Sequence, residues 1–198
     1  MIIPRRQFVT LTLGAVLLLL SGFSASAQTT NAAGKPEKPA KQATPVAETV
    51  AVKEIDTAGL AALLKRENGH PLLVNFWATW CEPCREEFPD LIKIDADYRA
   101  QGLELITISL DDITEIKAGV PKFLQEMGAM MPSYLLNVVD PEPAIRSVDP
   151  NWGGALPATV LYDKNGKIAF KHFGRIKPAE LRAAIDKLVG TQKVMSEK

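Results

Sequence analysis

The stretch NFWATWCEPCREEFPDL, residues Asn75 to Leu91, contains the only two cysteines of the chain, Cys81 and Cys84. It begins inside a segment, Leu72 to Trp77, that is apolar apart from one asparagine, and such a segment is typical of a strand covered on both faces. Apolar residues then recur at helical spacing from residue 83 to residue 100. The stretch therefore places a Cys-x-x-Cys pair where a buried strand ends and a helix begins.

Outside this stretch, segments with strand and helix patterns alternate along residues 50–190, which is typical of an α/β layered fold. Near the C-terminus the order changes, because two strand-like segments flank residues 163–166 (DKNG), a turn sequence that favours a β-hairpin. We therefore expect a mixed central sheet flanked by helices, with a C-terminal hairpin and a final helix that ends at Gly190. The further elements that the patterns predict are helices at 57–67, 114–127, 142–147 and 177–189 and strands at 103–110, 134–139, 158–162 and 167–173.

The composition excludes several classes of protein. The 23 basic and 23 acidic side chains cancel, so the chain lacks the basic surplus by which proteins bind nucleic acid. A hydrophobic content of 46% indicates a globular protein rather than a disordered or fibrous one. Two cysteines are too few for a disulfide scaffold, and a bridge that closes so small a loop removes little chain entropy. We therefore expect no nucleic-acid partner. We also expect the two cysteines to have a role other than a structural disulfide.

The N-terminus is predicted to carry an export signal. Residues 1–27 combine two arginines, an apolar run and small residues before a cleavage point, and the run is shorter than the roughly 20 residues that span a bilayer. We expect export to the periplasm by either the general or the twin-arginine route. The protein is then soluble if the signal is cleaved and tethered to the inner membrane if it is retained. Residues 28–49 have the composition of a disordered linker, residues 50–190 form one folded domain, and residues 191–198 are expected to be a flexible tail.

The two cysteines have the spacing of a redox pair. Three residues apart at the start of a helix, their sulfurs lie on one face and can close a small disulfide ring. Free amide groups and the helix dipole stabilise a thiolate there and lower the pKa of the thiol from about 8.5 toward 7. We expect Cys81, at the exposed rim, to attack a substrate disulfide, and Cys84, one turn deeper, to release the product. Pro83 stiffens the first turn, while the charge of Glu82 opposes thiolate formation.

Two motifs together resemble a known family. The stretch from Asn75 to Pro89 is similar to the active site of the TlpA/ResA/CcmG family of exported thiol-disulfide oxidoreductases, and ALPAT, residues Ala155 to Thr159, is similar to that family's cis-proline segment. The motifs occur in the family's order, and the resemblance covers residues 50–190. It implies a thioredoxin fold in an enzyme that reduces disulfides of exported proteins. Apocytochrome c, in cytochrome c biogenesis, is the substrate that the family suggests.

The resemblance assigns roles to further residues. It implies that Pro157 forms a cis peptide bond beside the disulfide and that Leu156 offers the substrate an apolar contact. Where thioredoxins have a buried aspartate that serves the second cysteine as a base, this chain has Asn75, which cannot titrate. ResA-like members carry an active-site glutamate at the position of Glu87, so we expect the proton-handling role there. The alternative for Glu87 is an ordinary solvated residue of a helix.

The predicted site combines a redox disulfide, Cys81–Cys84, with residues that handle protons and bind substrate. No cofactor and no metal are expected. We expect a monomer whose partners are disulfide-containing exported proteins and, because the compartment is oxidising, a membrane thiol-electron transporter of the DsbD/CcdA kind as reductant. The expected catalytic residues are Cys81, Cys84, Glu87 and Pro157, and the expected substrate-binding residues are Trp80, Glu82, Pro83 and Leu156.

Two questions stay open from the sequence. A copper or zinc carrier would use the same two cysteines with a histidine, His70 or His172, or with a partner's ligand. The Glu-Pro between the cysteines and the motif around Pro157 favour redox exchange over this alternative. Trp77 and Trp80 are as compatible with packing in the core as with a substrate surface.

Overall fold

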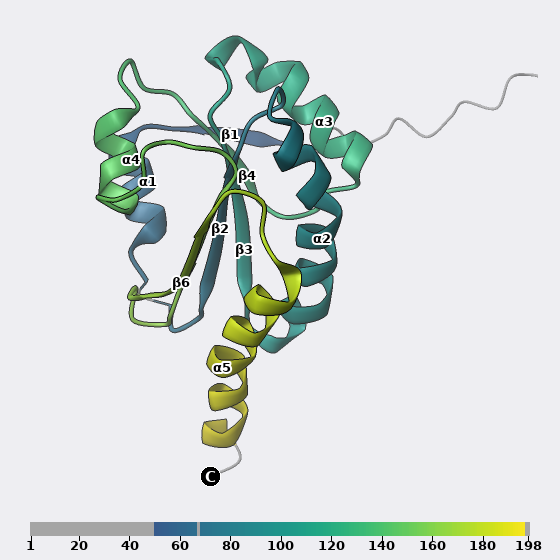
Figure 1. The fold of residues 1–198 in the computed structure, drawn as a ribbon, viewed down its shortest axis with the longest axis vertical. Coiled ribbons are helices and arrows are strands. Elements are labelled where there is room, and N and C mark those ends of the chain that lie inside the picture. The colour runs from purple at the N-terminus through teal and green to yellow at the C-terminus, as the bar shows by residue number, and fades with distance from the viewer. Residues whose placement is uncertain (1–49, 67, 197–198) are drawn as a thin grey trace, which may run out of the picture. The chain divides into compact units, whose positions relative to one another are not determined.

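A six-stranded sheet forms the centre of the structure, a computed structural model that describes residues 50–66 and 68–196 (Figure 1). Its strands are Val52–Ile55 (β1), Leu72–Trp77 (β2), Glu104–Ser109 (β3), Ser133–Leu136 (β4), Ala158–Tyr162 (β5) and Ile168–Phe173 (β6). They lie in the order β1-β4-β3-β2-β5-β6, with parallel pairing from β1 to β2 and antiparallel pairing of β2 with β5 and of β5 with β6. The expected export signal and linker, residues 1–49, lie outside the described residues.

Helices cover both faces of the sheet. They are Thr57–Leu64 (α1), Glu82–Tyr98 (α2), Gly119–Met127 (α3), Glu142–Val148 (α4) and Pro178–Ser196 (α5), with short 3-10 helices at Arg99–Gln101 (η1) and Ile113–Lys117 (η2). Helices α2, α3 and α5 cover one face, and α1 and α4 cover the other (Figure 1). The predicted mixed sheet flanked by helices, with a C-terminal hairpin and helix, is confirmed. Within residues 50–66 and 68–196, no helix has both the length and the apolar character needed to cross a membrane.

Strand β2 is buried along its whole length, as its apolar sequence predicted. Its side chains alternate between the two faces of the sheet. Leu73 and Trp77 belong to the core beneath α2, whereas Val74 and Phe76 belong to the core beneath α1 and α4. Asn75 shares the face of Leu73 and Trp77, and its side chain bonds to a residue of α2. The alternation thus directs one polar side chain into the core beneath that helix.

Two elements differ from the sequence prediction for local reasons. Strand β1 was not predicted, because its four residues lie at the edge of the sheet and contain no apolar run. The helix expected at 114–127 is divided at Ala118 into η2 and α3. Pro121 explains the division, since a proline lacks the amide hydrogen and its ring clashes with the carbonyl four residues earlier in a continuous helix. In the first turn of α3 the missing hydrogen is harmless.

The last helix is longer than predicted. Helix α5 continues to Ser196, so the expected end at Gly190 is wrong, and residues 191–196, expected within a flexible tail, are helical. A glycine inside a helix lowers stability by about 1 kcal/mol relative to alanine but does not by itself end the helix. It ends one when it takes a left-handed conformation, and Gly190 does not have a positive φ.

Val74 and Val139 form a matched pair that tests this core. Val74 is fully buried, whereas Val139 is fully exposed. Val74→Ala is expected to lower the free energy of unfolding by about 2 kcal/mol, because it removes apolar contacts and leaves a cavity. Val139→Ala should change it by less than about 0.5 kcal/mol. Urea denaturation of both oxidised variants measures the two effects, and equal losses would contradict the described packing.

Candidate active site

The disulfide Cys81–Cys84 lies at the start of helix α2, a few residues after the end of β2. Its sulfurs are 2.00 Å apart, and the two Cα atoms are 5.3 Å apart. Cys81 is the N-cap residue of the helix, and its Sγ accepts a hydrogen bond from the backbone N–H of Cys84 at 3.3 Å. One sulfur is therefore held against the positive end of the helix, where a thiolate is stabilised on reduction.

The sulfurs are less exposed than the sequence suggested. Cys81, expected at an exposed rim, is only 5% exposed, and Cys84 is 0% exposed. The rim is formed instead by Trp80, which is 71% exposed, and by the exposed residues Glu82 and Pro83. A substrate therefore meets these three residues first, and Cys81 is the one cysteine of the pair that it can reach.

The loop before the disulfide is fixed by an aspartate that the sequence analysis missed. The buried carboxylate of Asp111 accepts hydrogen bonds from the Thr79 backbone N–H at 3.0 Å and from the Thr79 hydroxyl at 2.6 Å. The Ser109 hydroxyl also donates to Asp111, at 2.6 Å. Arg85 makes a weaker contact to the Thr79 carbonyl, and its guanidinium lies 5.0 Å from the centre of the Phe123 ring. The signal that could have found Asp111 is its position two residues after a buried strand that pairs in parallel with β2.

The peptide bond between Leu156 and Pro157 is cis. Pro157 is buried, and its carbonyl accepts a hydrogen bond from the N–H of Gly174 at 2.8 Å. Strand β5 begins at the next residue, Ala158, which pairs with Phe76 near the end of β2. Leu156 is half-buried and packs against the core that contains both cysteines. The structure thus brings the cis-proline segment to the end of the sheet that carries the disulfide.

Glu87 is fully buried, so the alternative of a solvated helix residue is wrong. Its Oε1 accepts a hydrogen bond from Asn75 Nδ2 at 2.8 Å, and its Oε2 accepts one from the backbone N–H of Ile176 at 2.9 Å. Asn75 Nδ2 also donates to Thr159 Oγ1 at 3.1 Å, across the pairing of β2 with β5. Asn75, Glu87 and Thr159, all fully buried, are called the polar cluster below. The cluster lies beneath α2, and its glutamate follows Cys84 by one helical turn.

Burial raises the pKa of Glu87 to about 7, because the carboxylate loses its hydration beneath α2. The hydrogen bonds from Ile176 and Asn75 and the positive charge of Arg175 lower the pKa without cancelling this effect. A carboxyl group with a pKa near 7 both accepts and releases protons at neutral pH, which suits a group that handles the proton of a thiol. The proton-handling role predicted for Glu87 is therefore chemically available to it.

The two tryptophans of the cysteine motif have different environments. Trp77 is fully buried and contacts the rings of Phe88 and Phe123, with centroids 4.7 and 4.6 Å away. Trp80 is exposed and directly precedes Cys81. The first tryptophan therefore packs the core, and the second is available to a partner.

The alternative of a metal carrier adds one histidine or a partner's ligand to the two cysteines. Among the residues that it describes, no group of three or more His, Cys, Asp or Glu side chains is placed to hold a metal ion. The two histidines lie on different parts of the chain. His70 precedes the start of β2, and His172 lies on the edge strand β6, where its ring contacts the carbonyl of Arg175.

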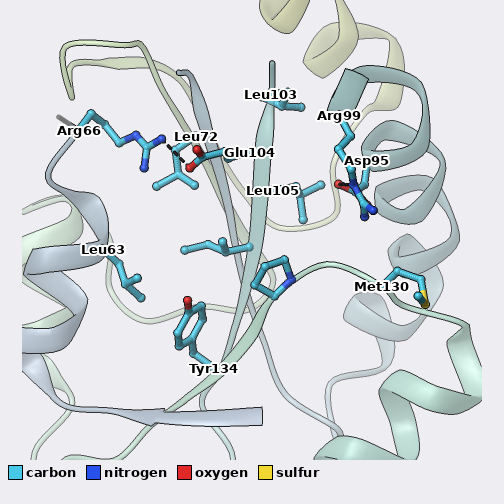
Figure 2. A pocket seen from close by; sticks show the side chains of 12 residues that line it. Leu63, Arg66, Leu72, Asp95, Arg99, Leu103, Glu104, Leu105, Met130 and Tyr134 are labelled. Carbon is cyan, nitrogen blue, oxygen red and sulfur yellow. Dashed lines mark hydrogen bonds and ion pairs between the residues drawn. The ribbon is translucent and has the colours of Figure 1, made fainter. Parts of the chain in front are cut away.

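The cavity shown in Figure 2 lies away from the cysteines. Its volume is about 480 Å³, and it opens beside the paired first residues of β2 and β3, whereas Cys81 follows the other end of β2. The ion pairs Arg66–Glu104 and Arg99–Asp95 lie in its wall, which is otherwise mostly apolar (Figure 2). None of the predicted site residues lines this cavity.

Comparison with known proteins finds a family and several relatives of this chain. The model of the AhpC/TSA family matches residues 42–171. The thiol-disulfide oxidoreductase ResA of Geobacillus thermodenitrificans is 33% identical over 114 residues, which make up 57% of this chain and 60% of that protein. The protein of the same name from Bacillus cereus is 29% identical over 133 residues, 67% of this chain and 72% of that protein. The chain thus spans less than two thirds of the length of the first relative.

A solved structure shows the same fold. The crystal structure of the thioredoxin domain of a thiol-disulfide oxidoreductase from Bacteroides vulgatus superposes with a TM-score of 0.51 at 25% identity. The superposition covers 65% of this chain and 83% of that domain. The thioredoxin fold that the sequence motifs implied is therefore confirmed, as is the resemblance to ResA-type proteins.

The buried carboxyl of Glu87 should make the stability of the oxidised protein depend on pH. Its pKa is raised from 4.5 to about 7, so the folded protein keeps this proton over a range in which the unfolded chain has lost it. The resulting stabilisation is fully present below about pH 4.5 and is lost as the pH rises through about 7. Relative to Glu87→Gln, the unmodified protein should lose on the order of 3 kcal/mol of unfolding free energy across this range.

Urea denaturation at a series of pH values, with the disulfide intact, measures this difference. Glu126→Gln is the matched control, because Glu126 is an exposed residue of helix α3 whose ion pair with Lys122 is long, at 4.0 Å. Its stability should follow that of the unmodified protein at every pH. If the free energies of unfolding of the unmodified protein and of Glu87→Gln differed by the same amount at every pH, the buried carboxyl would not titrate in this range.

Proposed function

The chain belongs to the AhpC/TSA family, and on that basis we propose that it is a thiol-disulfide oxidoreductase that reduces disulfides of exported proteins. The observation that carries the proposal is the Cys81–Cys84 disulfide at the start of helix α2, at the same end of the sheet as the cis bond before Pro157. The relatives named thiol-disulfide oxidoreductase ResA support the same class of reaction.

The reaction passes through a mixed disulfide. In the reduced protein, Cys81 attacks the substrate disulfide as a thiolate, and one substrate sulfur leaves as a thiolate. Cys84 then attacks the Cys81 sulfur, the second substrate sulfur leaves, and the Cys81–Cys84 bond forms again. Two electrons pass from the dithiol of the enzyme to the substrate, which becomes two thiols. The hydrogen bond from the Cys84 N–H to Cys81 Sγ supports the sulfur that carries the charge in the first step.

Glu87 handles the proton of the second cysteine. Cys84 must lose its proton before it attacks the mixed disulfide, and its complete burial opposes that loss. Glu87 lies one turn further along the same face of α2, and with a pKa of about 7 it takes the proton at neutral pH. It returns the proton when the pair is reduced again.

The charges around the pair favour a reductant over an oxidant. A disulfide becomes more oxidising as its reduced, thiolate form is more strongly stabilised. In this chain Glu82 and Glu87 place negative charge near the cysteines, and both oppose a thiolate. The nearby cation, Arg85, contacts the Thr79 carbonyl and the Phe123 ring, and its Nε lies 3.9 Å from the exposed Glu82 carboxylate. Reduction of substrates is therefore the direction that these residues support.

The substrate contacts the exposed rim. Trp80, Glu82 and Pro83 surround the reachable sulfur, and the large exposed ring of Trp80 offers apolar area at little cost in conformational entropy. Leu156, half-buried before the cis bond, completes the apolar part of the surface. An extended segment that carries the substrate disulfide lies between the rim and the cis-proline segment.

We place the reaction in the periplasm, on the basis of the export signal predicted in residues 1–27. An oxidising compartment cannot regenerate the dithiol, so a membrane thiol-electron transporter of the DsbD/CcdA kind is the proposed reductant. Apocytochrome c is the proposed substrate among exported proteins, because its cysteines must be reduced before haem is attached. The resemblance to ResA-type proteins supports this choice.

The reduction potential of the purified protein tests the direction of electron flow. Equilibration with glutathione buffers, followed by labelling of free thiols, should give a potential below about −200 mV. A value near about −120 mV, which is that of a strong oxidant, would reverse the assignment. Cys84→Ser should accumulate a mixed disulfide with a disulfide-containing peptide, whereas Cys81→Ser should accumulate none.

Alkylation of the reduced protein tests which sulfur a substrate can reach. Iodoacetamide should modify Cys81 before Cys84, because Cys84 is completely buried and only Cys81 has accessible surface. Mass spectrometry of peptides after short exposure measures the order of modification. Protection of both cysteines in the folded, reduced protein would exclude a thiol-exchange reaction at this site.

A further inference from the structure

The polar cluster beneath α2 contains one polar atom without a partner. Asn75 Nδ2 donates hydrogen bonds to Glu87 Oε1 and Thr159 Oγ1, so one end of the amide is fully used. The other end, Oδ1, is buried and has no hydrogen-bond partner among the described residues. Buried polar groups are almost always paired, so a free acceptor next to an ionisable side chain requires an explanation.

The observed arrangement suits only the ionised form of Glu87. The Ile176 N–H donates to Oε2 and the Asn75 amide donates to Oε1, so both carboxyl oxygens act as acceptors. A protonated carboxyl adds a donor hydrogen on one oxygen, and because both partners of the Glu87 carboxyl are themselves donors, this hydrogen would find no acceptor. The Ile176 N–H belongs to the backbone and cannot be exchanged for an acceptor. The side-chain amide of Asn75 can present an acceptor instead of a donor, because it can turn over about its last rotatable bond.

We propose that Asn75 is a positioning residue whose side-chain amide turns over when Glu87 changes its protonation state. Nδ2 faces the carboxylate, and Oδ1 faces the carboxylic acid. The two ends of an amide have nearly the same size, so the rotation fits the same space. In the turned state Oδ1 accepts hydrogen bonds from the Glu87 carboxyl and from the Thr159 hydroxyl, which rotates to donate. Each orientation leaves one end of the amide free, and the proton on Glu87 therefore decides between them.

This inference rests on the proposed function, in which Glu87 takes the proton of Cys84 and later returns it. An amide fixed in the observed orientation would favour the carboxylate alone and would oppose the arrival of the proton. An amide that turns over provides a hydrogen-bond partner for both forms. It thereby gives Glu87 a hydrogen-bond partner in both halves of the exchange, within a fully buried cluster.

Charged groups face Glu87 from several elements. Asp90 on α2 raises the pKa of Glu87, and Arg175, in the loop before α5, lowers it. Glu86 pairs with Arg175 at 2.6 Å, and the ring of His172 on β6 contacts the Arg175 carbonyl at 2.9 Å. Strands β2 and β5 contribute only the neutral members of the polar cluster. If the NMR signal of the Asn75 amide changes with pH, variants of these neighbours must therefore show whether Glu87 or a neighbour causes the change.

NMR of the oxidised, isotope-labelled protein between pH 5 and pH 9 tests the rotation, since disulfide-bonded cysteines do not titrate. The coupling through the hydrogen bond between Asn75 Nδ2 and Glu87 Cδ should be present at pH 9 and lost at pH 5. The chemical shifts of the Asn75 side-chain amide should titrate with the same midpoint as Glu87 Cδ. A coupling that persists, or an amide that stays unchanged, after Glu87 has become an acid would overturn the proposal.

Glu87→Gln provides a second, independent test. The Ile176 N–H needs an acceptor, so the glutamine oxygen takes the place of Oε2 and its NH2 group faces Asn75. This variant imitates the acid, and its Asn75 amide should give the pH 5 signal at every pH. The pH 9 signal in this variant would overturn the proposal. Glu86→Gln and His172→Gln should preserve the titration of the Asn75 amide, and its loss in either variant would assign the change to that neighbour.

Disulfide reduction separates the two proposals when it is measured on the same preparations after dithiothreitol has reduced the Cys81–Cys84 disulfide and has then been removed. A protein that reduces a disulfide-containing peptide while its Asn75 amide stays fixed would refute the rotation and leave the proposed function standing. A protein that fails to reduce the peptide would refute the proposed function, whatever the amide does.

Discussion

The sulfur of Cys81 caps helix α2, and the rest of the site is arranged around this contact. A cap lies where the chain leaves a strand and begins a helix, so the pairing of β2 with β3 and β5 determines where the sulfur is held. The pairing continues one residue past the end of β3, since the Leu110 N–H donates to the Trp77 carbonyl at 2.8 Å. Asp111 then binds Thr79 from the same side and fixes the remaining loop. The reactive sulfur is thus positioned by the most deeply buried part of the sheet.

Burial is the main cause of the raised pKa of Glu87, and the contacts of its neighbours allow the pKa to stay raised. Arg175 is the cation whose charge lowers the pKa of the carboxyl, and a direct ion pair with it would hold the pKa low. Arg175 instead bonds to Glu86, the preceding residue on the solvent side of α2. Glu87 is left with a backbone amide and the neutral side chain of Asn75, which stabilise its charge less than a cation would. The buried carboxyl therefore lowers the free energy of unfolding at neutral pH, and in return the site has a group that titrates near neutral pH.

The sequence predicted the elements whose patterns are long and local. The apolar run of β2, the helical spacing of α2 and the turn between β5 and β6 each extend over several residues, so the mixed sheet and its helices could be foreseen. The edge strand β1 could not, since it is short and lacks an apolar run. At the site, spacing identified Cys81 and Cys84, and the family resemblance identified Glu87. The contact of Asp111 with Thr79 was missed, because the two residues are far apart in sequence and meet only when β3 pairs with β2.

The loop that approaches Glu87 is held mainly by packing. Glu87 can therefore gain or lose a proton while this loop stays in place. The side chain of Ile176 is buried in the core that contains both cysteines, while its backbone N–H donates to the Glu87 carboxyl. The neighbouring pair of Arg175 with Glu86 is half exposed and contributes about 1 kcal/mol or less. A protonated Glu87 still offers Oε2 to the Ile176 N–H, provided that its hydrogen lies on Oε1. The proton is thus directed to the side of Asn75, where the side-chain amide can adapt and the backbone cannot.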